Sequence, residues 1–444
     1  MTGPPAPLSR LWSRVRGSLW PLPVLAIVVA IALGIGLPAL DEVLEQPGGE
    51  HPLIFVFGGG PSAARDLLAA IAGSLISVTG LTFSFTVVAL QLSSSQHSPR
   101  LLQTFATDRV VQLTLAQLVG TFVYALTVLR TVRTEDAASG GFAVVPRLSV
   151  TVGFVLTLAS VVAIVLFLGH LATSLRVETM LRDVHDEATA TYDRELPRPG
   201  EQPERGSLPM GPPRLLTARS SGFVVDVVHP PVVRAARAAG ATVLLVPRMG
   251  DSVVAGTPLA HVWAGGGEDT AALDDALQAA VHLGFERSPA HDVAYSLRKV
   301  VDIAVRALSP GTNDPTTAVH AMSHVSALLG QLVVRPPVPR VFRDDEGVVR
   351  LVLPPWEVPA LIRVGLEEPL QFAGGQPAVL RRIAGLLREV AWRAPDGGVE
   401  AALREYAVRL VDLARETTSV DEAEIGRWER DLGEALAGRW APAP

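Results

Sequence analysis

Cysteine is absent from this chain of 444 residues. The sequence therefore excludes disulfides, thiolate metal sites and cysteine nucleophiles. Lysine is nearly absent, because Lys299 is the single lysine and the remaining basic residues are arginine. The net charge is −6 and the pI is about 6.0, which gives no reason to expect a nucleic-acid partner. The chain also has no Walker A loop, Rossmann fingerprint or G-x-S-x-G elbow, and we expect neither an enzyme nor a cofactor.

Charge is missing from the middle of four long apolar segments in the first 176 residues. Each segment has the length of ~20 residues that a membrane-spanning helix needs. The absence of charge argues against a pump or a secondary transporter, which use intramembrane charges as relays. His170 is the one ionisable group within the four segments, and we expect it to reach the membrane interface. The four predicted spans are residues 19–40, 67–92, 110–129 and 148–175.

The distribution of arginine predicts how these spans are oriented. Three arginines precede the first span within residues 10–16, and the loop that follows it, residues 41–50, carries four acidic residues. Arg100 lies in the second connection, and Arg176 follows the fourth span. Basic residues collect on the cytoplasmic side of a membrane. We therefore expect a multi-pass protein of the bacterial cytoplasmic (inner) membrane with both termini in the cytoplasm.

Small and polar residues form stripes along two of the spans. At 100° per residue, one face of the second span collects small or polar residues, and Thr79, Thr82 and Thr86 lie opposite. Such a stripe is typical of close helix packing, and also of a pore wall in a homo-oligomer. The stripe of the third span is expected to face the second span or a neighbouring copy. These packing or pore-lining candidates are Gly73, Ser77, Gly80, Ser84 and Gln91 in the second span, and Gln117, Thr121 and Tyr124 in the third.

The rest of the chain has the composition of a cytoplasmic α+β domain. Its hairpins around GDSVVAGTPLAHV are similar to those of barrel-sandwich domains, but the lysine that carries a prosthetic group there is missing. The predicted fold is an α-helical integral membrane bundle of four spans, followed by a small β-barrel-like module and helices. The expected parts are a cytoplasmic tail (1–18), the transmembrane domain (19–176), a juxtamembrane helix and linker (177–213), the β-module (214–264) and a mainly helical domain (268–440).

Within the helical domain, apolar periodicity predicts seven helices and one hairpin. The hairpin spans residues 338–353 and turns at residues 344–347. The expected helices are residues 271–284, 290–308, 315–334, 357–367, 377–393, 398–417 and 421–437.

The stretch RALSPGTNDPTTAVHAM, residues 306–322, separates two of these helices. Pro310 ends the incoming helix, and Gly311 suits a left-handed exit. Asp314 is a good N-cap, and Pro315 fits the first helical position. Asn313, Thr316 and Thr317 keep side chains to spare. The candidate cytoplasmic motif consists of Asp302, Arg306, Ser309, Pro310, Gly311, Asn313, Asp314, Pro315 and Thr317.

Two other interpretations of this region were weighed. His320 and His324, four residues apart on one helix, are spaced to share a metal, but Ala321 stands where a zincin has glutamate. Asp302 and Arg306 fit a helix ion pair equally well. We favour a structural polar network between packed helices and expect no metal.

The run SPGTNDPTTA, together with SSSQHSPRLL and GDSVVAGTPLAHV, resembles a bacterial family of predicted membrane proteins, the domain of unknown function 2254. The resemblance covers nearly the whole chain. It implies an inner-membrane protein with four spans and a cytoplasmic domain, and it brings no activity. This chain departs from the pattern at His291, where we expect glutamine, and at Thr316, where we expect an aromatic residue.

Two functions fit these observations. The first is a passive homo-oligomeric channel in the lipid bilayer, with a cytoplasmic regulatory domain. The alternative is a membrane-anchored sensor or scaffold whose corner at Asn313 and Asp314 contacts a cytoplasmic partner or ligand.

Overall fold

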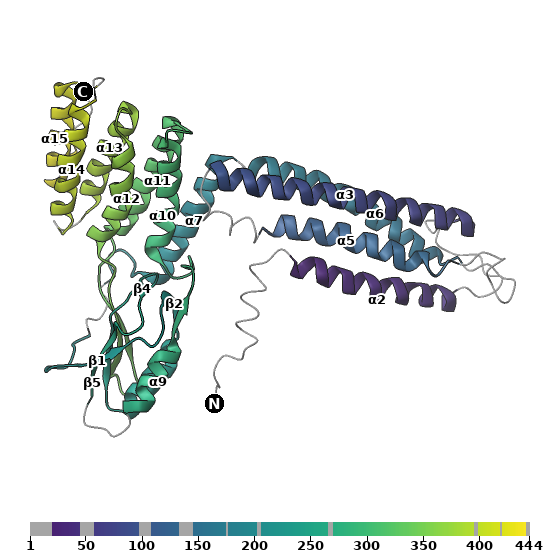
Figure 1. The fold of residues 1–444 in the computed structure, drawn as a ribbon, viewed down its shortest axis with the longest axis horizontal. Coiled ribbons are helices and arrows are strands. Elements are labelled where there is room, and N and C mark those ends of the chain that lie inside the picture. Colours follow the sequence, from purple (N-terminus) through teal and green to yellow (C-terminus); the bar gives the residue numbers. More distant parts are fainter. Residues whose placement is uncertain are drawn as a thin grey trace. The chain divides into compact units, whose positions relative to one another are not determined.

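The computed structural model describes residues 20–44, 57–96, 108–132, 145–174, 176–201, 206–264, 270–394, 398–417 and 420–440, without the side chains of residues 92–96. The chain divides into two compact units, Met1–Thr179 and Met180–Pro444 (Figure 1). The predicted tail, residues 1–18, and Arg100 lie outside the described residues.

Four long helices form the first unit and confirm the predicted spans. All four are long and apolar enough to cross a membrane. Helix α5 packs against each of the other three, and its Leu118, Tyr124 and Val128 are fully buried in the core of the bundle. The helices are α2 (Pro21–Leu44), α3 (Pro61–Gln96), α5 (Arg109–Leu129) and α6 (Arg147–Ser174).

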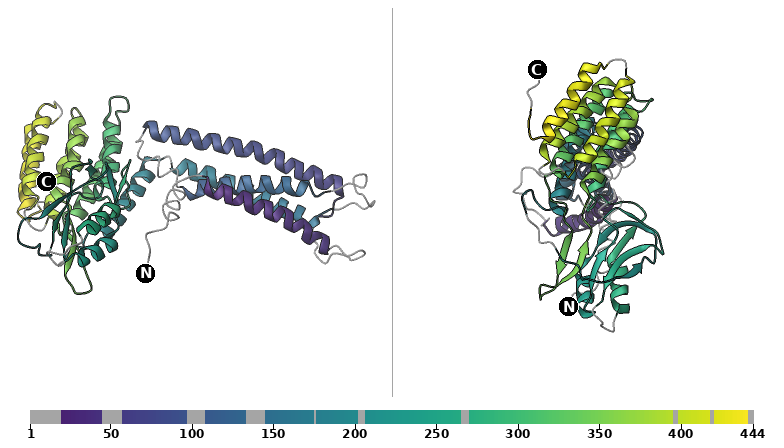
Figure 2. Two further views of the ribbon diagram at one scale, coloured as in Figure 1. Left: turned by 60° about the horizontal axis from the view of Figure 1, so that its bottom comes forward. Right: turned by 90° about the vertical axis from the view of Figure 1, so that its left-hand side faces the viewer.

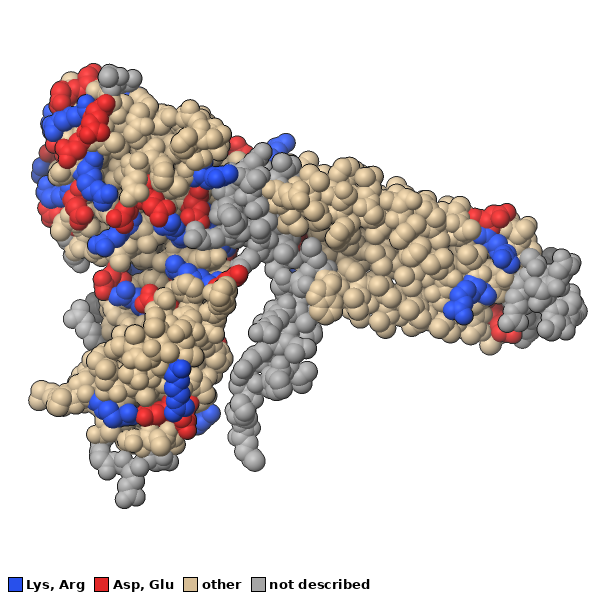
Figure 3. Space-filling view, in the orientation of Figure 1, with Lys and Arg blue, Asp and Glu red and all other residues tan. Residues whose placement is uncertain are grey.

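A carboxylate joins two helices at each end of this bundle. Asp41 of α2 caps α6, accepting hydrogen bonds from the Leu148 and Ser149 amides at 3.0 Å each and from the Ser149 hydroxyl at 2.6 Å. At the other end, Asp108 caps α5 and lies 2.5 Å from Nε2 of His170. His170 therefore finds a partner in the protein. Between the ends, the visible face of the bundle carries no Lys, Arg, Asp or Glu (Figure 3).

The second unit contains two open sheets. The five-stranded sheet has the order β1-β5-β3-β8-β7, in which β3 and β8 are parallel, and the three-stranded sheet has the order β4-β2-β6. The expected barrel-like module is thus wrong, because neither sheet closes and both include strands from beyond residue 264. The strands are β1 (Arg214–Thr217), β2 (Gly222–Val227), β3 (Thr242–Leu245), β4 (Ser252–Val253), β5 (Pro258–Trp263), β6 (Val281–Gly284), β7 (Arg340–Arg343) and β8 (Val349–Leu353).

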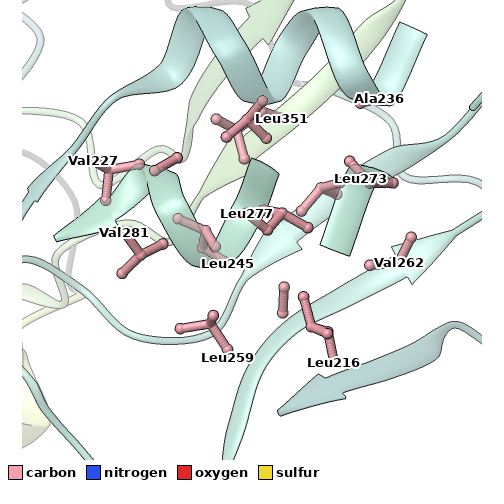
Figure 4. Close-up of a cluster of buried hydrophobic side chains, with 14 of the residues drawn as sticks. Leu216, Val227, Ala236, Leu245, Leu259, Val262, Leu273, Leu277, Val281 and Leu351 are labelled. Carbon is pink, nitrogen blue, oxygen red and sulfur yellow. The ribbon is translucent and has the colours of Figure 1, made fainter. Parts of the chain in front are cut away.

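An apolar core holds these sheets to two helices, α8 (His229–Ala238) and α9 (Thr270–Ala280). Leu273 and Leu277 of α9 point into a cluster with Leu245 and Leu259 of the sheet (Figure 4). The helix predicted for residues 271–284 ends early, because residues 281–284 form β6 and pair with β2. Pairing with a strand distant in sequence decides this segment, which local periodicity could not show.

Helices form the remainder of the unit. Figure 2 shows the C-terminal helices side by side, and α11 packs against α10 and α13, while α13 packs against α15. The helices predicted here are confirmed with shifts of a few residues at their ends. They are α10 (Val293–Leu308), α11 (Pro315–Leu332), α12 (Val358–Phe372), α13 (Pro377–Arg393), α14 (Glu400–Arg415) and α15 (Glu422–Leu436), preceded by the juxtamembrane helix α7 (Val177–Glu195).

Candidate functional site

The small-residue stripe of α3 faces out of the bundle. A Cβ added to Gly73 or Gly80 would meet nothing within 4 Å. The opposite face, with Thr82 and Thr86, is buried. The stripe therefore packs against nothing in the described part of this chain. Its exposed members are Gly73, Ser77, Gly80, Ser84 and Gln91.

The outward faces of α2 and α6 differ from this stripe because they carry large apolar side chains. Such side chains suit contact with lipid tails. The stripe is thus a small and polar surface beside an apolar one. The exposed apolar residues include Val24, Leu25, Val28, Val29, Ile31, Leu33 and Ile35 on α2, and Phe154, Val155, Leu158, Val161, Val162, Val165 and Leu166 on α6. Helix α3 itself also exposes Ile76, Leu81, Phe83, Phe85, Val87 and Val88 around the stripe.

Several hydroxyl groups of α3 bond to their own helix. Thr79 donates to the Leu75 carbonyl at 2.6 Å, and Ser77 donates to the Gly73 carbonyl at 3.2 Å. Thr82 and Thr86 make the same bond to the residue four positions earlier. Hydroxyls bonded in this way are satisfied in lipid without water. They are therefore compatible with helix packing and with a pore alike.

The polar seam of α5 has its partner inside the chain, and that partner is α6. The Gln117 amide donates to the Leu156 carbonyl at 3.2 Å and to the Ser160 hydroxyl at 3.4 Å. Tyr124 donates to the Ser149 carbonyl at 2.9 Å. We expected the second span or a neighbouring copy, but a serine hydroxyl and backbone carbonyls of the fourth span satisfy this seam. Gln117, Thr121 and Tyr124 also line a cavity of about 220 Å³ between α2, α5 and α6.

The corner between α10 and α11 is stiff and largely exposed. Asp314 caps α11, accepting hydrogen bonds from the Thr317 amide at 3.1 Å and the Thr317 hydroxyl at 2.6 Å. The bond from that hydroxyl, above all, holds the pKa of Asp314 below its usual value. Pro315 begins the helix as predicted. These contacts confirm the capping interpretation of the motif.

The left-handed residue of the corner is Asn313 and not Gly311. Among the described residues that are not glycine, Asn313 is the one with a positive φ, 46°. Asparagine tolerates this conformation better than most residues. Its side-chain oxygen accepts a hydrogen bond from Gln376 at 2.8 Å, while Pro310 and Gly311 are exposed.

Two motif residues lie before the corner, on α10. Asp302 accepts a hydrogen bond from Arg298 at 3.1 Å, and Arg298 also pairs with Glu368 of α12. Arg306 is exposed, and its carbonyl accepts the Ser309 hydroxyl at 2.7 Å. Asp302 thus belongs to the packing of α10 on α12, in line with a structural polar network.

The juxtamembrane helix α7 is joined to the other helices of the second unit by ion pairs that the sequence did not reveal. Lys299 of α10 is 1% exposed, and its Nζ lies 2.8 and 2.9 Å from the two carboxylate oxygens of Glu187. Arg335 pairs with Asp193 and donates to the Tyr192 carbonyl at 3.1 Å. The single lysine of the chain thus holds α7 in place.

The last residue of α7, Glu195, is a buried carboxylate between two cationic groups. Arg340 Nη1 lies 2.5 Å away, and His291 Nδ1 lies 2.6 Å away. The bond from Glu195 raises the pKa of His291, and this outweighs the opposite effect of burial. A cavity of about 40 Å³ adjoins this group. It has room for a water molecule or two, and is far smaller than the ~300 Å³ of a metabolite site.

The residue after His291, Asp292, links α10 to the turn after β3. Asp292 is buried, caps α10 through the Tyr295 amide at 3.0 Å, and pairs with Arg287 Nη2 at 2.6 Å. Burial raises the pKa of Asp292 more than Arg287 lowers it. The Gly-Asp turn after β3 lies against this carboxylate, because a Cβ on Gly250 would lie 1.9 Å from Asp292 Oδ2.

Two histidines, one on α7 and one on α11, lie side by side. The Nδ1 atoms of His185 on α7 and His324 on α11 are 3.3 Å apart, and His320 is exposed one turn before His324. Burial and the neighbouring histidines lower the pKa of His324. In the parts of the chain that the structure describes, no group of three His, Cys, Asp or Glu surrounds a common point.

Comparison with known proteins places this architecture in a family. A family model described as "Predicted membrane protein (DUF2254)" matches residues 16–389. Uncharacterised proteins of Mycobacterium tuberculosis and Mycobacterium bovis are each 32% identical over 416 residues, which cover 92% of this chain and 78% of theirs. No solved structure matches.

Proposed function

The chain belongs to the DUF2254 family of predicted membrane proteins, and we propose that it is a homo-oligomeric passive channel with a cytoplasmic regulatory domain. The proposal goes beyond the family, whose function is unknown. One observation supports it above the others: the exposed stripe of α3, with Gly73, Ser77, Gly80, Ser84 and Gln91.

Physical chemistry favours covering this stripe with another helix or with water. Glycine and serine offer lipid tails little apolar surface, whereas small residues let two helices approach closely and gain van der Waals contact. A second copy of α3 supplies both a close neighbour and polar partners.

Several copies arranged around an axis would place the α3 stripes along a central path. Serine hydroxyls and helix carbonyls bind a passing solute weakly, which permits passage without trapping. The described spans carry no charge in their middle that would act as a relay, in keeping with passive flow. Two residues separate α6 from α7 in the chain, so the domain that holds α7 is covalently close to a span and suited to regulate it.

Ion flux into proteoliposomes tests this proposal. We expect the purified protein to conduct ions. Ser77→Leu or Ser84→Leu should change the flux at least several-fold, because the larger apolar side chain narrows the path and excludes water from it. Val162→Leu on the exposed apolar face of α6 is the matched control and should leave flux unchanged. Equal flux in all four proteins, or flux no greater than in empty vesicles, would contradict the proposal.

The sensor or scaffold is the second candidate, and the exposed left-handed Asn313 favours it. Backbone conformations of this kind concentrate at functional sites. Asn313→Gly keeps the backbone and removes the amide, whereas Gln376→Ala removes its partner at 2.8 Å. Loss of a cytoplasmic partner in Asn313→Gly, with normal flux, would favour the scaffold. The same partners with both variants would exclude the corner as the contact.

A further inference from the structure

Two histidines, His185 on α7 and His324 on α11, are spaced as ligands of one metal ion. Their Nδ1 atoms are 3.3 Å apart, and their ring planes are inclined by 67°. Two nitrogens bound to one tetrahedral zinc at ~2.0–2.1 Å lie about 3.3–3.4 Å from each other. N–H···O hydrogen bonds are usually about 2.7–3.2 Å long. The separation of the two nitrogens is thus compatible with a shared cation and long for a direct hydrogen bond.

We propose that His185 and His324 bind a divalent transition-metal ion of the zinc class, with His320 as a third ligand. Imidazole nitrogens are the ligands that zinc, nickel and copper ions share. His320 and His324 are four residues apart on α11, the spacing with which two histidines of one helix bind zinc. His320 is exposed and is not grouped with the other two histidines in the structure, so the proposal requires its side chain to change rotamer. Water completes the coordination.

The surroundings of the pair suit a neutral imidazole, which is the form that binds metal. Both rings are half-buried, and burial disfavours the charged form of an imidazole. Asp186, which follows His185, is exposed and adds a negative charge near the ion.

Metal binding at this point would fasten α7 to α11. The same two helices are joined by Thr189 and Gln331, whose side chains are 3.3 Å apart. An ion between His185 and His324 adds a stronger link one turn earlier on α7. The metal site rests on the two helices of the cytoplasmic unit alone and does not depend on a channel function.

Zinc titration of the full-length protein tests the proposal. The protein is purified in detergent without a polyhistidine tag, treated with EDTA and titrated in a calorimeter, with bound zinc counted by elemental analysis. We expect one zinc per chain. His185→Gln and His324→Gln should each weaken binding about 100-fold, and His320→Ala about 10-fold, since losing a ligand costs at least as much as losing its supporting partner.

His261→Gln is the matched control, because this histidine lies on β5, away from α7 and α11. It should bind zinc as the unchanged protein does. If all variants retain one zinc, or the unchanged protein retains none, the proposal is wrong.

A second measurement needs no variant. Hydrogen exchange in the unchanged protein should slow on zinc addition at residues 180–190 and 320–328, and recover with EDTA. Protection confined to other segments would overturn the assignment, even if a variant failed to fold.

Discussion

Gly250 lies where a side chain has no room. Its φ is +82°, and a Cβ would clash with the buried Asp292 carboxylate at 1.9 Å. Gly256 has a similar φ of +85°, but a Cβ there would meet nothing within 4 Å. The two glycines thus share a backbone conformation and differ in their surroundings.

We expect Gly250→Ala to destabilise the second unit by more than about 3 kcal/mol, and Gly256→Ala by about 1–2 kcal/mol, which is the left-handed penalty alone. Denaturant unfolding followed by tryptophan fluorescence measures both. Equal losses of stability in the two variants would mean that the turn at Gly250 moves away from Asp292 at little cost in free energy.

The bond between His291 and Glu195 makes the end of α7 sensitive to pH. The folded pKa of His291 is raised, so its stabilising contribution is complete below the unfolded value of about 6.5. The contribution is lost as pH rises through the folded pKa. Hydrogen exchange of residues 190–196, corrected for the intrinsic rate, should therefore increase above about pH 6.5. The increase should vanish in His291→Gln; its persistence there would assign the effect to another group.

At the scale of elements, the ion pair between Glu187 and Lys299 is one of several contacts that dock α7. Lys299 is almost inaccessible, while the Glu187 side chain is about a third exposed, at 30%. Removing one partner leaves the other charge poorly solvated. For a fully buried pair this costs 3–5 kcal/mol, and solvent near Glu187 reduces the cost to about 2–3 kcal/mol.

Glu187→Leu is therefore expected to destabilise the second unit by about 2–3 kcal/mol, and the double variant Glu187→Leu/Lys299→Met by less. Unfolding by urea, with both single variants as references, measures the coupling. Additive losses would show that the pair contributes little beyond packing.

Local patterns predicted the helices of this unit, because caps and breakers such as Asp314 and Pro315 act within a few residues. They failed where the partner is distant in sequence. Strand β6 needs β2, and Lys299 meets Glu187 across 112 positions. The meeting of His185 and His324 spans 139 positions. The left-handed residue of the corner was predicted at Gly311 and is Asn313. This error has a different cause, because residue preferences are too weak to locate one left-handed residue in a short turn.

At the scale of the whole molecule, the absence of cysteine makes the stripe easy to test. Ser84→Cys gives a chain with one thiol on the exposed face of α3. If copies meet at this face, mild oxidation should produce disulfide-linked dimers, because two such residues on facing helices come within reach. Val162→Cys on α6 is the matched control and should stay monomeric in a denaturing gel.

The same thiol distinguishes a pore from dry packing. A charged, water-soluble thiol reagent should modify Ser84→Cys only if the stripe lines water. Dimers without modification would favour packing, while modification with blocked flux would favour a pore. A Ser84→Cys chain that neither dimerises nor reacts would leave the stripe in lipid and remove the basis of the channel.

The capping of α6 by Asp41 also bears on how the protein is made. The carboxylate and the amides that satisfy it are 107 and 108 positions apart. During synthesis the first span therefore emerges from the ribosome long before its partner exists. Until the fourth span is inserted, Asp41 must remain at the water-exposed edge of the bilayer. The contact between Asp41 and α6 is thus a late step of biogenesis. Chains truncated before residue 147 would keep the packing of α2 on α5 and lose the partners of Asp41.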